Sequence, residues 1–416
     1  MELRQGYKQT EVGVIPKDWE VKAVKSLNFD ISDGNYSSKY PKASDFRPTG
    51  VPFIRANNVR NMKVVDDDMR FISIEQHREL LKGHLKKNDV LITTRGEIGQ
   101  IALVPDCHID SNINAQIVRI NTSNQPIDYR FLAYSLSSES SQEQLKNLET
   151  GSALKQLPVG KLVLLILVVP PLPEQRAIAA ALSDVDALLA KLDALIAKKR
   201  DLKQAAMQQL LTGQTRLPGF SGAWEVKRLG EVADVDPENL SSNTQPNYAF
   251  NYISLEDVDF GVLRSYSEQL FSTSPSRARR SLQKGDVLVS TVRPNLKSHL
   301  LFNIDATNWV CSTGFSVVRC RDGLTHPGYV FMLFFGHKIM RQIDALLTGS
   351  NYPAINGGDV RTLEIPVPEY KEQAAIAEVL SDMDAEIAAL EARRDKTLAL
   401  KQGMMQELLT GRIRLV

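Results

Sequence analysis

The stretch EQRAIAAALSDVDALLAKLDALIAKKRDLKQAAMQQLLTGQTRL, residues 174–217, decides how this chain of 416 residues is organised. It recurs without a gap at residues 372–415 as EQAAIAEVLSDMDAEIAALEARRDKTLALKQGMMQELLTGRIRL. The two copies are identical at 25 of the 44 aligned positions. A repeat of this length and similarity indicates one structural unit that is used twice.

Both copies have the apolar spacing of long helices that pair with another helix. Apolar residues recur at alternating steps of four and three, a period near 3.5 that lets one helix lie along another. Pro173 and Pro368 fit a first helical turn, and Gly213 and Gly411 fit a left-handed cap. The alternative is an ordinary amphipathic core helix. The predicted seam consists of Ile178, Leu182, Val185, Leu189 and Leu192 in the first copy and of Ile376, Leu380, Met383, Ile387 and Leu390 in the second.

Composition excludes several classes of protein. The net charge is +1, so any basic surface must be local. Three cysteines, Cys107, Cys311 and Cys320, form no disulfide framework or zinc-finger spacing and suit a reducing compartment. The most apolar run, residues 162–169, is too short to cross a bilayer and predicts a buried strand. The N-terminus carries no apolar signal core, so we expect a soluble, cytoplasmic protein.

The repeat extends beyond the helices into the rest of the chain. Three further pairs recur, namely Trp19–Lys22 with Trp224–Lys227, Leu85–Leu91 with Leu282–Leu288, and Thr150–Ser152 with Thr348–Ser350. Each half therefore consists of a globular domain followed by a long helix. We predict domains at residues 1–172 and 215–367 and long spacer helices at residues 173–214 and 368–416. The expected fold class is α+β, with two mixed domains joined and separated by two long antiparallel helices in a pseudo-twofold repeat.

Runs rich in Val and Ile predict strands in both domains, and two amphipathic runs predict helices. The predicted strands are residues 51–54, 90–93, 101–104, 116–120, 252–255, 287–291 and 315–318, and the predicted short helices are residues 128–136 and 329–335.

Catalytic motifs are scarce. There is no phosphate-binding loop of the Gly-x-x-x-x-Gly-Lys type, and the glycine pair Gly96 and Gly99 has the wrong spacing for a dinucleotide turn. No Asn-Pro-Pro-aromatic run indicates an amino-methyltransferase, and the six histidines have no triad spacing. Glu20-x-Lys22 and Glu225-x-Lys227 resemble the tail of a metal-dependent nuclease motif, which also needs an upstream carboxylate. We therefore assign no catalytic residue and no metal ligand, and a nuclease stays as an alternative.

Residues suited to binding recur at matching places in the two halves. Arg bridges two acceptors on guanine and Asn or Gln grips adenine in the same way, whereas Lys and Ser more often hold phosphates. The candidates in the first half are Asn57, Asn58, Arg60, Thr94, Arg95, Ser152, Lys155 and Gln156. Those in the second half are Arg277, Arg279, Arg280, Arg293, Asn295, Lys297, Ser350, Asn351 and Tyr352.

On these residues the chain resembles the specificity subunit of type I restriction–modification enzymes over nearly its whole length. The resemblance rests on Trp19 and Trp224, on Asp89–Ile92 followed by Arg95-Gly96-x-x-Gly99, on Thr150–Ser152, and on Pro171–Ile178 leading into the first long helix. The second half departs from the pattern, because Val292-Arg293-Pro294 replaces Arg95-Gly96-Glu97.

This resemblance implies two target recognition domains, each reading one half of a split double-stranded DNA site. It implies that the helices dock two modification subunits, which bind S-adenosylmethionine, and that restriction subunits bring ATP- and Mg-dependent cleavage. The chain itself would bind no cofactor and would not catalyse. The helices are expected to keep more free apolar surface than one seam uses, and the modification subunits to cover part of it; this surface includes Leu188, Leu195, Met207, Leu210, Met405 and Leu408.

One further alternative stays open beside the nuclease. A coiled-coil scaffold joining two protein-binding domains would have the same repeat, because paired helices and duplicated domains serve that role equally well. Salt-dependent affinity for DNA separates the two readings, since only a DNA-binding protein releases counterions when it binds.

Overall fold

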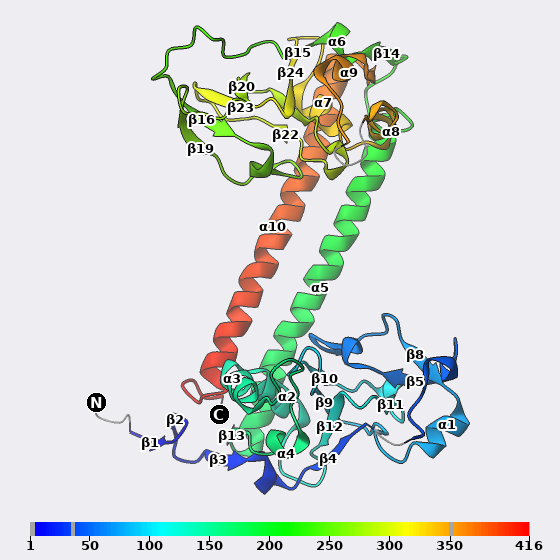
Figure 1. Ribbon diagram of the computed structural model, residues 1–416, viewed down its shortest axis with the longest axis vertical. Coiled ribbons are helices and arrows are strands. Elements are labelled where there is room, and N and C mark those ends of the chain that lie inside the picture. Colours follow the sequence, from blue (N-terminus) through cyan, green and yellow to red (C-terminus); the bar gives the residue numbers. More distant parts are fainter. Residues whose placement is uncertain (1–4, 35–37, 349–352, 416) are drawn as a thin grey trace. The chain divides into compact units, whose positions relative to one another are not determined.

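The computed structural model describes residues 5–34, 38–348 and 353–415 (Figure 1). The chain forms two compact units, one of residues 1–191 with 393–416 and the other of residues 192–392. Each unit holds one globular domain, the first part of the helix that follows it, and the last part of the other long helix. The expected α+β class with two long helices is confirmed.

The first domain is built on a six-stranded sheet beside a three-stranded one. The larger sheet has the order β4 (Asp30–Asp33), β12 (Ile117–Asn121), β9 (Val90–Thr93), β10 (Ile101–Leu103), β7 (Met62–Val64) and β6 (Val59–Arg60). The smaller sheet has the order β11 (Asn112–Ile113), β5 (Val51–Ile54) and β8 (Arg70–Ile72). Two further antiparallel pairs lie in the described part of this domain, β1 (Tyr7–Thr10) with β2 (Gly13–Pro16) and β3 (Glu20–Ala23) with β13 (Ile166–Val169).

Among the described residues of the first domain there are four short α-helices, and only α2 was predicted. They are α1 (Ile74–Glu79), α2 (Tyr129–Ser137), α3 (Glu139–Leu148) and α4 (Val159–Leu162). Asp128 caps α2, because its carboxylate accepts from the backbone N–H groups of Arg130 and Phe131. The predicted strand at residues 162–169 is wrong in its first part, since Leu162 ends α4 and the strand begins at Ile166.

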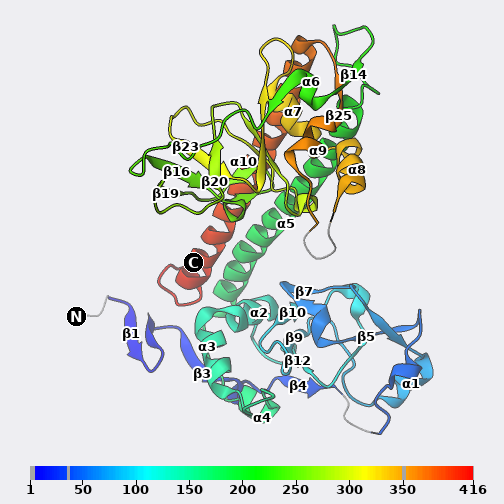
Figure 2. The ribbon, with the colours of Figure 1, turned by 45° about the horizontal axis from the view of Figure 1, so that its top comes forward.

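The second domain repeats this plan with two four-stranded sheets (Figure 2). One has the order β15 (Ala233–Val235), β24 (Phe315–Cys320), β21 (Val287–Ser290) and β22 (Leu300–Leu301), and the other has β19 (Ser267–Leu270), β16 (Ala249–Ile253), β23 (Trp309–Ser312) and β20 (Ala278–Ser281). Two-stranded pairs join β17 (Val258–Asp259) to β18 (Val262–Leu263) and β14 (Glu225–Arg228) to β25 (Glu364–Val367). The helices are α6 (Leu229–Val232), α7 (Pro327–Leu333), α8 (His337–Leu346) and α9 (Gly357–Thr362).

The repeated stretches form two helices of equal length, α5 (Leu172–Leu210) and α10 (Tyr370–Leu408), with 39 residues each. At about 1.5 Å per residue each is roughly 58 Å long. Gly213 and Gly411 follow them with φ of 70° and 72°, the left-handed conformation expected of cap glycines. All ten residues of the predicted seam are buried or half-buried.

The repeated Glu-Gln pair explains how each helix is attached to its own domain. Gln175 is buried, accepts from the backbone N–H of Asp128 at 2.9 Å and donates to the carbonyls of Pro126 and Pro170. In the second unit Gln373 repeats all three bonds with His326, Leu324 and Pro368. A buried amide with every bond made fixes the direction in which the helix leaves its domain.

Within each unit the two helices run antiparallel and are joined by ion pairs. Lys401 of α10 lies 2.7 Å from Asp186 of α5 in the first unit. In the second unit Lys199 contacts Glu386 at 2.6 Å and Lys203 pairs with Asp384. As one residue number rises its partner's falls, which is the register of an antiparallel pair.

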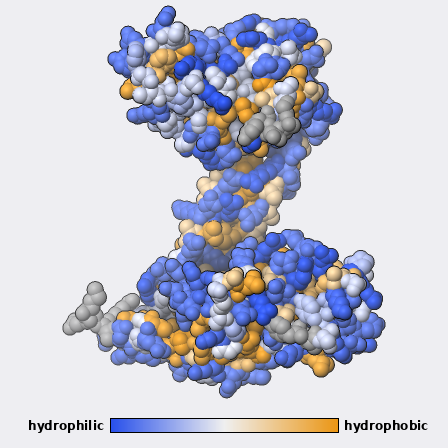
Figure 3. All heavy atoms as spheres, viewed as in Figure 1, coloured by the Kyte–Doolittle hydropathy of each residue, from blue (hydrophilic) through white to orange (hydrophobic). Residues whose placement is uncertain are grey.

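Part of the expected free apolar surface is covered by the chain itself. Leu210 and Leu408 are 8% and 4% exposed, and Met207 and Met405 are half-buried in the same cores. That expectation was wrong because the end of each helix packs under the start of the other. Leu188 and Leu195 do remain exposed, and Figure 3 shows apolar side chains along the helices. Apolar residues that sequence analysis had not singled out are also exposed there: Leu202, Leu398 and Leu400.

No helix in the described part of the chain is long and apolar enough to span a membrane.

Candidate nucleic-acid interface

In the first domain two loops lie against each other where β9 ends. The backbone of Arg95 forms a bridge with Gln156, and the N–H of Leu157 donates to the carbonyl of Thr94 at 2.9 Å. Arg95 and Lys155 are exposed, and Lys155 lies 3.1 Å from Glu149. The structure therefore brings Arg95, Lys155 and Gln156 together on one surface.

A hydrogen bond from α3 holds the turn that carries Arg95. Gly99 has a φ of 84° and its carbonyl accepts from Gln142 of α3 at 3.0 Å. Because a φ of 84° is one that L side chains rarely adopt, this position favours glycine. Arg95 thus projects from a loop of defined geometry.

The second domain repeats the two-loop arrangement with a changed register of side chains. Val292 forms the bridge with Ala354 that Arg95 forms with Gln156. Arg293 follows it with a φ of 49°, in the place of Gly96 with a φ of 76°. The exposed arginine therefore stands one position later in the second domain, where its N–H donates to the carbonyl of Pro353 at 2.9 Å.

The other predicted residues after β21 differ in their exposure to solvent. Asn295 is exposed, and Lys297 is half-buried with a φ of 54°. In the first domain Ser152, whose counterpart is Ser350, is exposed. Ser350, Asn351 and Tyr352 lie outside the described residues.

The prediction that Asn58 and Thr94 contact DNA is wrong, because both side chains are buried and hydrogen-bonded within the domain. The side-chain amide of Asn58 donates to the carbonyls of Val65 and Asp67 and its oxygen accepts from the N–H of Arg55. Asn58 is 0% exposed. Thr94 is 5% exposed and its hydroxyl donates to the carbonyl of Gln116 at 3.1 Å.

Their neighbours Asn57 and Arg60 are exposed. Arg60 ends β6, the edge strand of the six-stranded sheet, and pairs with Asp67. Asn57 and Arg60 therefore form a second exposed group of the first domain, on a different strand connection from Arg95.

Of the three arginines in the predicted basic cluster of the second domain, only Arg277 is exposed. Arg280 is mostly buried and lies 2.6 Å from Asp236, so it is a structural ion pair and not a contact residue. Arg279 is half-buried, stacks over the ring of Phe271 at 4.9 Å and donates to the carbonyl of Ala278. Arg277 is exposed.

The nuclease alternative finds no support in the geometry. Glu20 and Glu225 each pair with the lysine two residues on, at 2.5 Å and 2.6 Å, and that hydrogen bond lowers the pKa of both carboxyls. Among the described residues, no group of three His, Cys, Asp or Glu ligands includes either glutamate.

Sequence reasoning missed the buried carboxylate at the start of each long helix. In the first unit Glu174 accepts from the indole of Trp19 at 2.9 Å and from the guanidinium of Arg414 at 2.6 and 2.7 Å. The bonds to Glu174 and Asp18 raise the pKa of Arg414. The repeated Trp, Glu and Arg were visible as a pattern, since all three recur in the second half.

Comparisons with known proteins identify the family to which the chain belongs. Residues 16–198 and 222–400 each match the family model described as the type I restriction modification DNA specificity domain. The putative type I restriction enzyme MjaX specificity subunit of Methanocaldococcus jannaschii is 24% identical over 99% of this chain and 97% of its own length. The type I restriction enzyme EcoKI specificity subunit of Escherichia coli is 22% identical over 97% and 90%.

Solved structures share the fold. The crystal structure of a type I restriction–modification system S subunit from M. genitalium has a TM-score of 0.58 at 16% identity and covers 98% of both chains. A chain from a structural study of type I R-M system assembly has a TM-score of 0.59 at 19% identity, over 96% of this chain and 99% of that one.

Proposed function

Because the chain belongs to the family of type I restriction–modification specificity subunits, with two copies of the family domain, we propose that it recognises a DNA target in two parts. Each domain reads one half-site, and the stretch between the half-sites is not read. The two halves differ in sequence, since the position that Gln156 occupies in the first recognition loop corresponds to Ala354 in the second.

The observation that carries this proposal is the recurrence of the two-loop surface in both domains. Each surface combines one exposed arginine, Arg95 or Arg293, with a second loop. A backbone bridge joins the two loops, between Arg95 and Gln156 in the first domain and between Val292 and Ala354 in the second. An arginine reads guanine through two hydrogen bonds, and a contact of this kind contributes about 1–3 kcal/mol of discrimination. Lys155 supplies a positive charge suited to a phosphate beside the base contact.

In this proposal the chain provides recognition and no catalysis. Two modification subunits bring S-adenosylmethionine and the methyl-transfer site, and restriction subunits bring ATP- and Mg-dependent translocation and cleavage. The exposed leucines of the long helices, among them Leu188, Leu195 and Leu398, support docking of the modification subunits. Such a stripe of apolar side chains is typical of a protein interface.

The test uses the chain assembled with its modification subunits. We expect DNA binding whose affinity falls steeply with salt, and methylated adenines at a two-part target in cells that express both proteins. Assembly with the modification subunits but no salt-dependent DNA binding would favour the scaffold alternative. Cleavage of DNA by the isolated chain with magnesium would favour the nuclease.

A further inference from the structure

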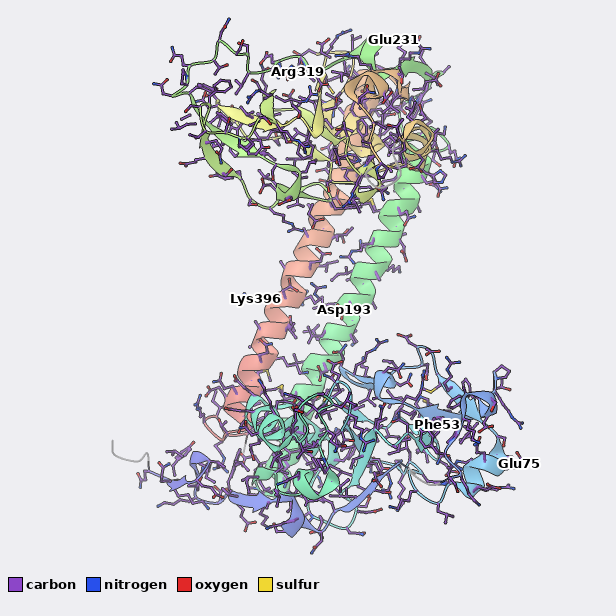
Figure 4. All side chains as sticks on the ribbon, in the orientation of Figure 1. Phe53, Glu75, Asp193, Glu231, Arg319 and Lys396 are labelled. Atoms are coloured by element: carbon purple, nitrogen blue, oxygen red, sulfur yellow. The ribbon has the colours of Figure 1, made fainter. Side chains whose placement is uncertain are left out.

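Two histidines and an aspartate meet in a lobe of the first domain away from the two-loop surface described above. His77 is on α1, His84 follows that helix, and Asp110 precedes β11. Their possible ligand atoms all lie within 4.8 Å of one another. Phe53 of β5 and Glu75 of α1 mark this lobe in Figure 4. His77 is 4% exposed, and Asp110 lies at the surface.

Hydrogen bonds on the far side of each imidazole determine which ring nitrogen is free to bind. Nε2 of His84 lies against the backbone carbonyl of Leu80, which only accepts, so this nitrogen carries the proton and Nδ1 has the lone pair. Nδ1 of His77 lies against the side-chain oxygen of Asn112, and with the amide in this orientation Nδ1 donates and Nε2 has the lone pair. An imidazole bound to a metal is held in the same way, by a hydrogen bond from its other nitrogen to an oxygen.

The two lone-pair nitrogens both face the carboxylate of Asp110. His77 Nε2 is 3.4 Å from one carboxylate oxygen, and His84 Nδ1 is 3.4 Å from the other. A usual N–H···O hydrogen bond is about 2.7–3.2 Å long. Two ligand atoms that are each about 2.0–2.1 Å from a tetrahedral Zn²⁺ lie about 3.3 Å apart. The separations therefore fit a shared cation better than direct hydrogen bonds.

In the second domain the corresponding strands pair at this place without His84 or Asp110, and none of its described residues form a helix that corresponds to α1. His84 bridges Asn112 in the first domain, and Ser281 pairs with Val310 in the second. The left-handed residue before these strands is Asp110 in the first domain and Asn308 in the second, with φ of 63° and 62°. This strand pairing therefore does not depend on His84 or Asp110, and their place beside His77 calls for a separate explanation.

We propose that His77 Nε2, His84 Nδ1 and the Asp110 carboxylate bind one divalent transition-metal ion, with Zn²⁺ as the natural occupant. Two imidazoles and a carboxylate are donors that suit Zn²⁺, and the exposed side of Asp110 leaves the fourth position to water. The ion joins α1 and the loop after it to the start of β11. Its role is to stabilise this lobe, and it takes no part in a reaction.

The test uses the full chain without a histidine tag, freed of metal by a chelator and titrated with Co²⁺, whose visible absorption reports tetrahedral coordination. We expect one equivalent to bind and Zn²⁺ to displace it. His84→Ser and Asp110→Asn place the second domain's residues at these positions, so both should fold, and each should weaken Co²⁺ binding at least tenfold. His337→Ser, at an exposed histidine of the second domain, is the matched control and should bind as the parent does.

Thermal unfolding gives a second readout. Zn²⁺ should raise the unfolding temperature of the parent and of His337→Ser, and should leave Asp110→Asn unchanged, because a ligand stabilises only the folded state that binds it. The proposal is overturned if the parent shows no Co²⁺ absorption, or if His84→Ser and Asp110→Asn bind the metal as tightly as the parent.

Discussion

The guanidinium of Arg414 holds the buried carboxylate of Glu174 through two hydrogen bonds of 2.6 and 2.7 Å. The two residues are 240 positions apart, and their contact ties the end of α10 to the start of α5 within the first unit. Arg216 and Glu372 repeat the contact in the second unit with bonds of 2.5 and 2.6 Å. The segment that follows each long helix therefore forms an ion pair with the first turn of the other long helix.

Arg414→Ala should destabilise the first unit by about 3–5 kcal/mol, because removing one partner leaves the other charge buried and unpaired. The free energy of unfolding by urea measures the effect. Arg412→Ala is the control from the same segment, since Arg412 is exposed and makes only a 3.3 Å pair with Glu407; it should cost less than about 0.5 kcal/mol. Equal losses of unfolding free energy in the two variants would show that the contact of Arg414 with Glu174 does not stabilise the first unit.

Gln175→Glu should loosen the attachment of α5 to the first domain. The substitution replaces the side-chain N–H group that donates to Pro126 and Pro170 with an oxygen that faces two carbonyls. We expect a loss of at least about 2 kcal/mol in the free energy of unfolding. Gln204→Glu, on an exposed part of the same helix, should be neutral, and a similar loss in both variants would argue against the buried amide as the anchor.

His299 should make the second unit sensitive to acid. Burial lowers its pKa to about 3, and its Nδ1 accepts from the backbone N–H of Ser290 at 3.1 Å. An unfolded histidine has a pKa near 6.5. Below that pH the unfolded chain takes up a proton that the folded chain refuses, so stability falls as the pH decreases from about 6.5 toward 3.

His299→Asn keeps an acceptor for Ser290 and cannot titrate in this range. The parent should lose more stability than His299→Asn between pH 7 and pH 5, as measured by urea denaturation at each pH. Identical losses in the two proteins would mean that His299 is not the group responsible.

Lengthening both helices should lengthen the unread part of the DNA target, on the proposed function. Residues 210 and 408 end α5 and α10, so an insertion must lie earlier, and ion pairs along both helices require it in both. We choose four residues between Asp193 and Ala194 and four between Arg393 and Arg394. Four residues add about 6 Å, and each base pair advances about 3.4 Å and turns the duplex by about a tenth of a turn.

We expect a spacer longer by one base pair, or at most two, with both half-sites unchanged, as read by methylation mapping. The apolar face is nearly preserved by an insertion of four residues, so the pairing of the helices should survive. An insertion in α5 alone is the control. It should weaken the pairing of the two helices, and with it assembly with the modification subunits, because it shifts Lys199 and Lys203 away from Glu386 and Asp384. An active double-insertion variant with an unaltered spacer would refute a role of helix length.

Much of this architecture could be predicted from the sequence because its signals are local. The steps of the apolar residues, the cap glycines and runs such as Val90–Thr93 each depend on neighbours a few positions away. The candidate interface was harder, because burial depends on distant parts of the chain. Asn58 and Thr94 are polar residues in loops that the rest of the domain covers.

Contacts over long sequence separations could not be predicted either. Arg280 reads as a basic surface residue until the fold places it against Asp236. The replacement of Arg95-Gly96-Glu97 by Val292-Arg293-Pro294 already puts Arg293 in the place of Gly96, whereas the bridge between Val292 and Ala354 became visible only in the structure. The sequence contained the repeated Trp, Glu and Arg of the helix ends, yet their contact became visible only in the structure.

The most direct test of two-part recognition compares Arg95→Ala with Arg293→Ala. Each variant is expressed with the modification subunits, and methylated adenines are mapped across the genome of the host. The account predicts that Arg95→Ala relaxes the preference for one half-site and Arg293→Ala that for the other, while the spacer stays the same. If both variants relax the same half-site, or both methylate the parent's sites with unchanged preference, the assignment of one half-site to each domain through these loops is contradicted.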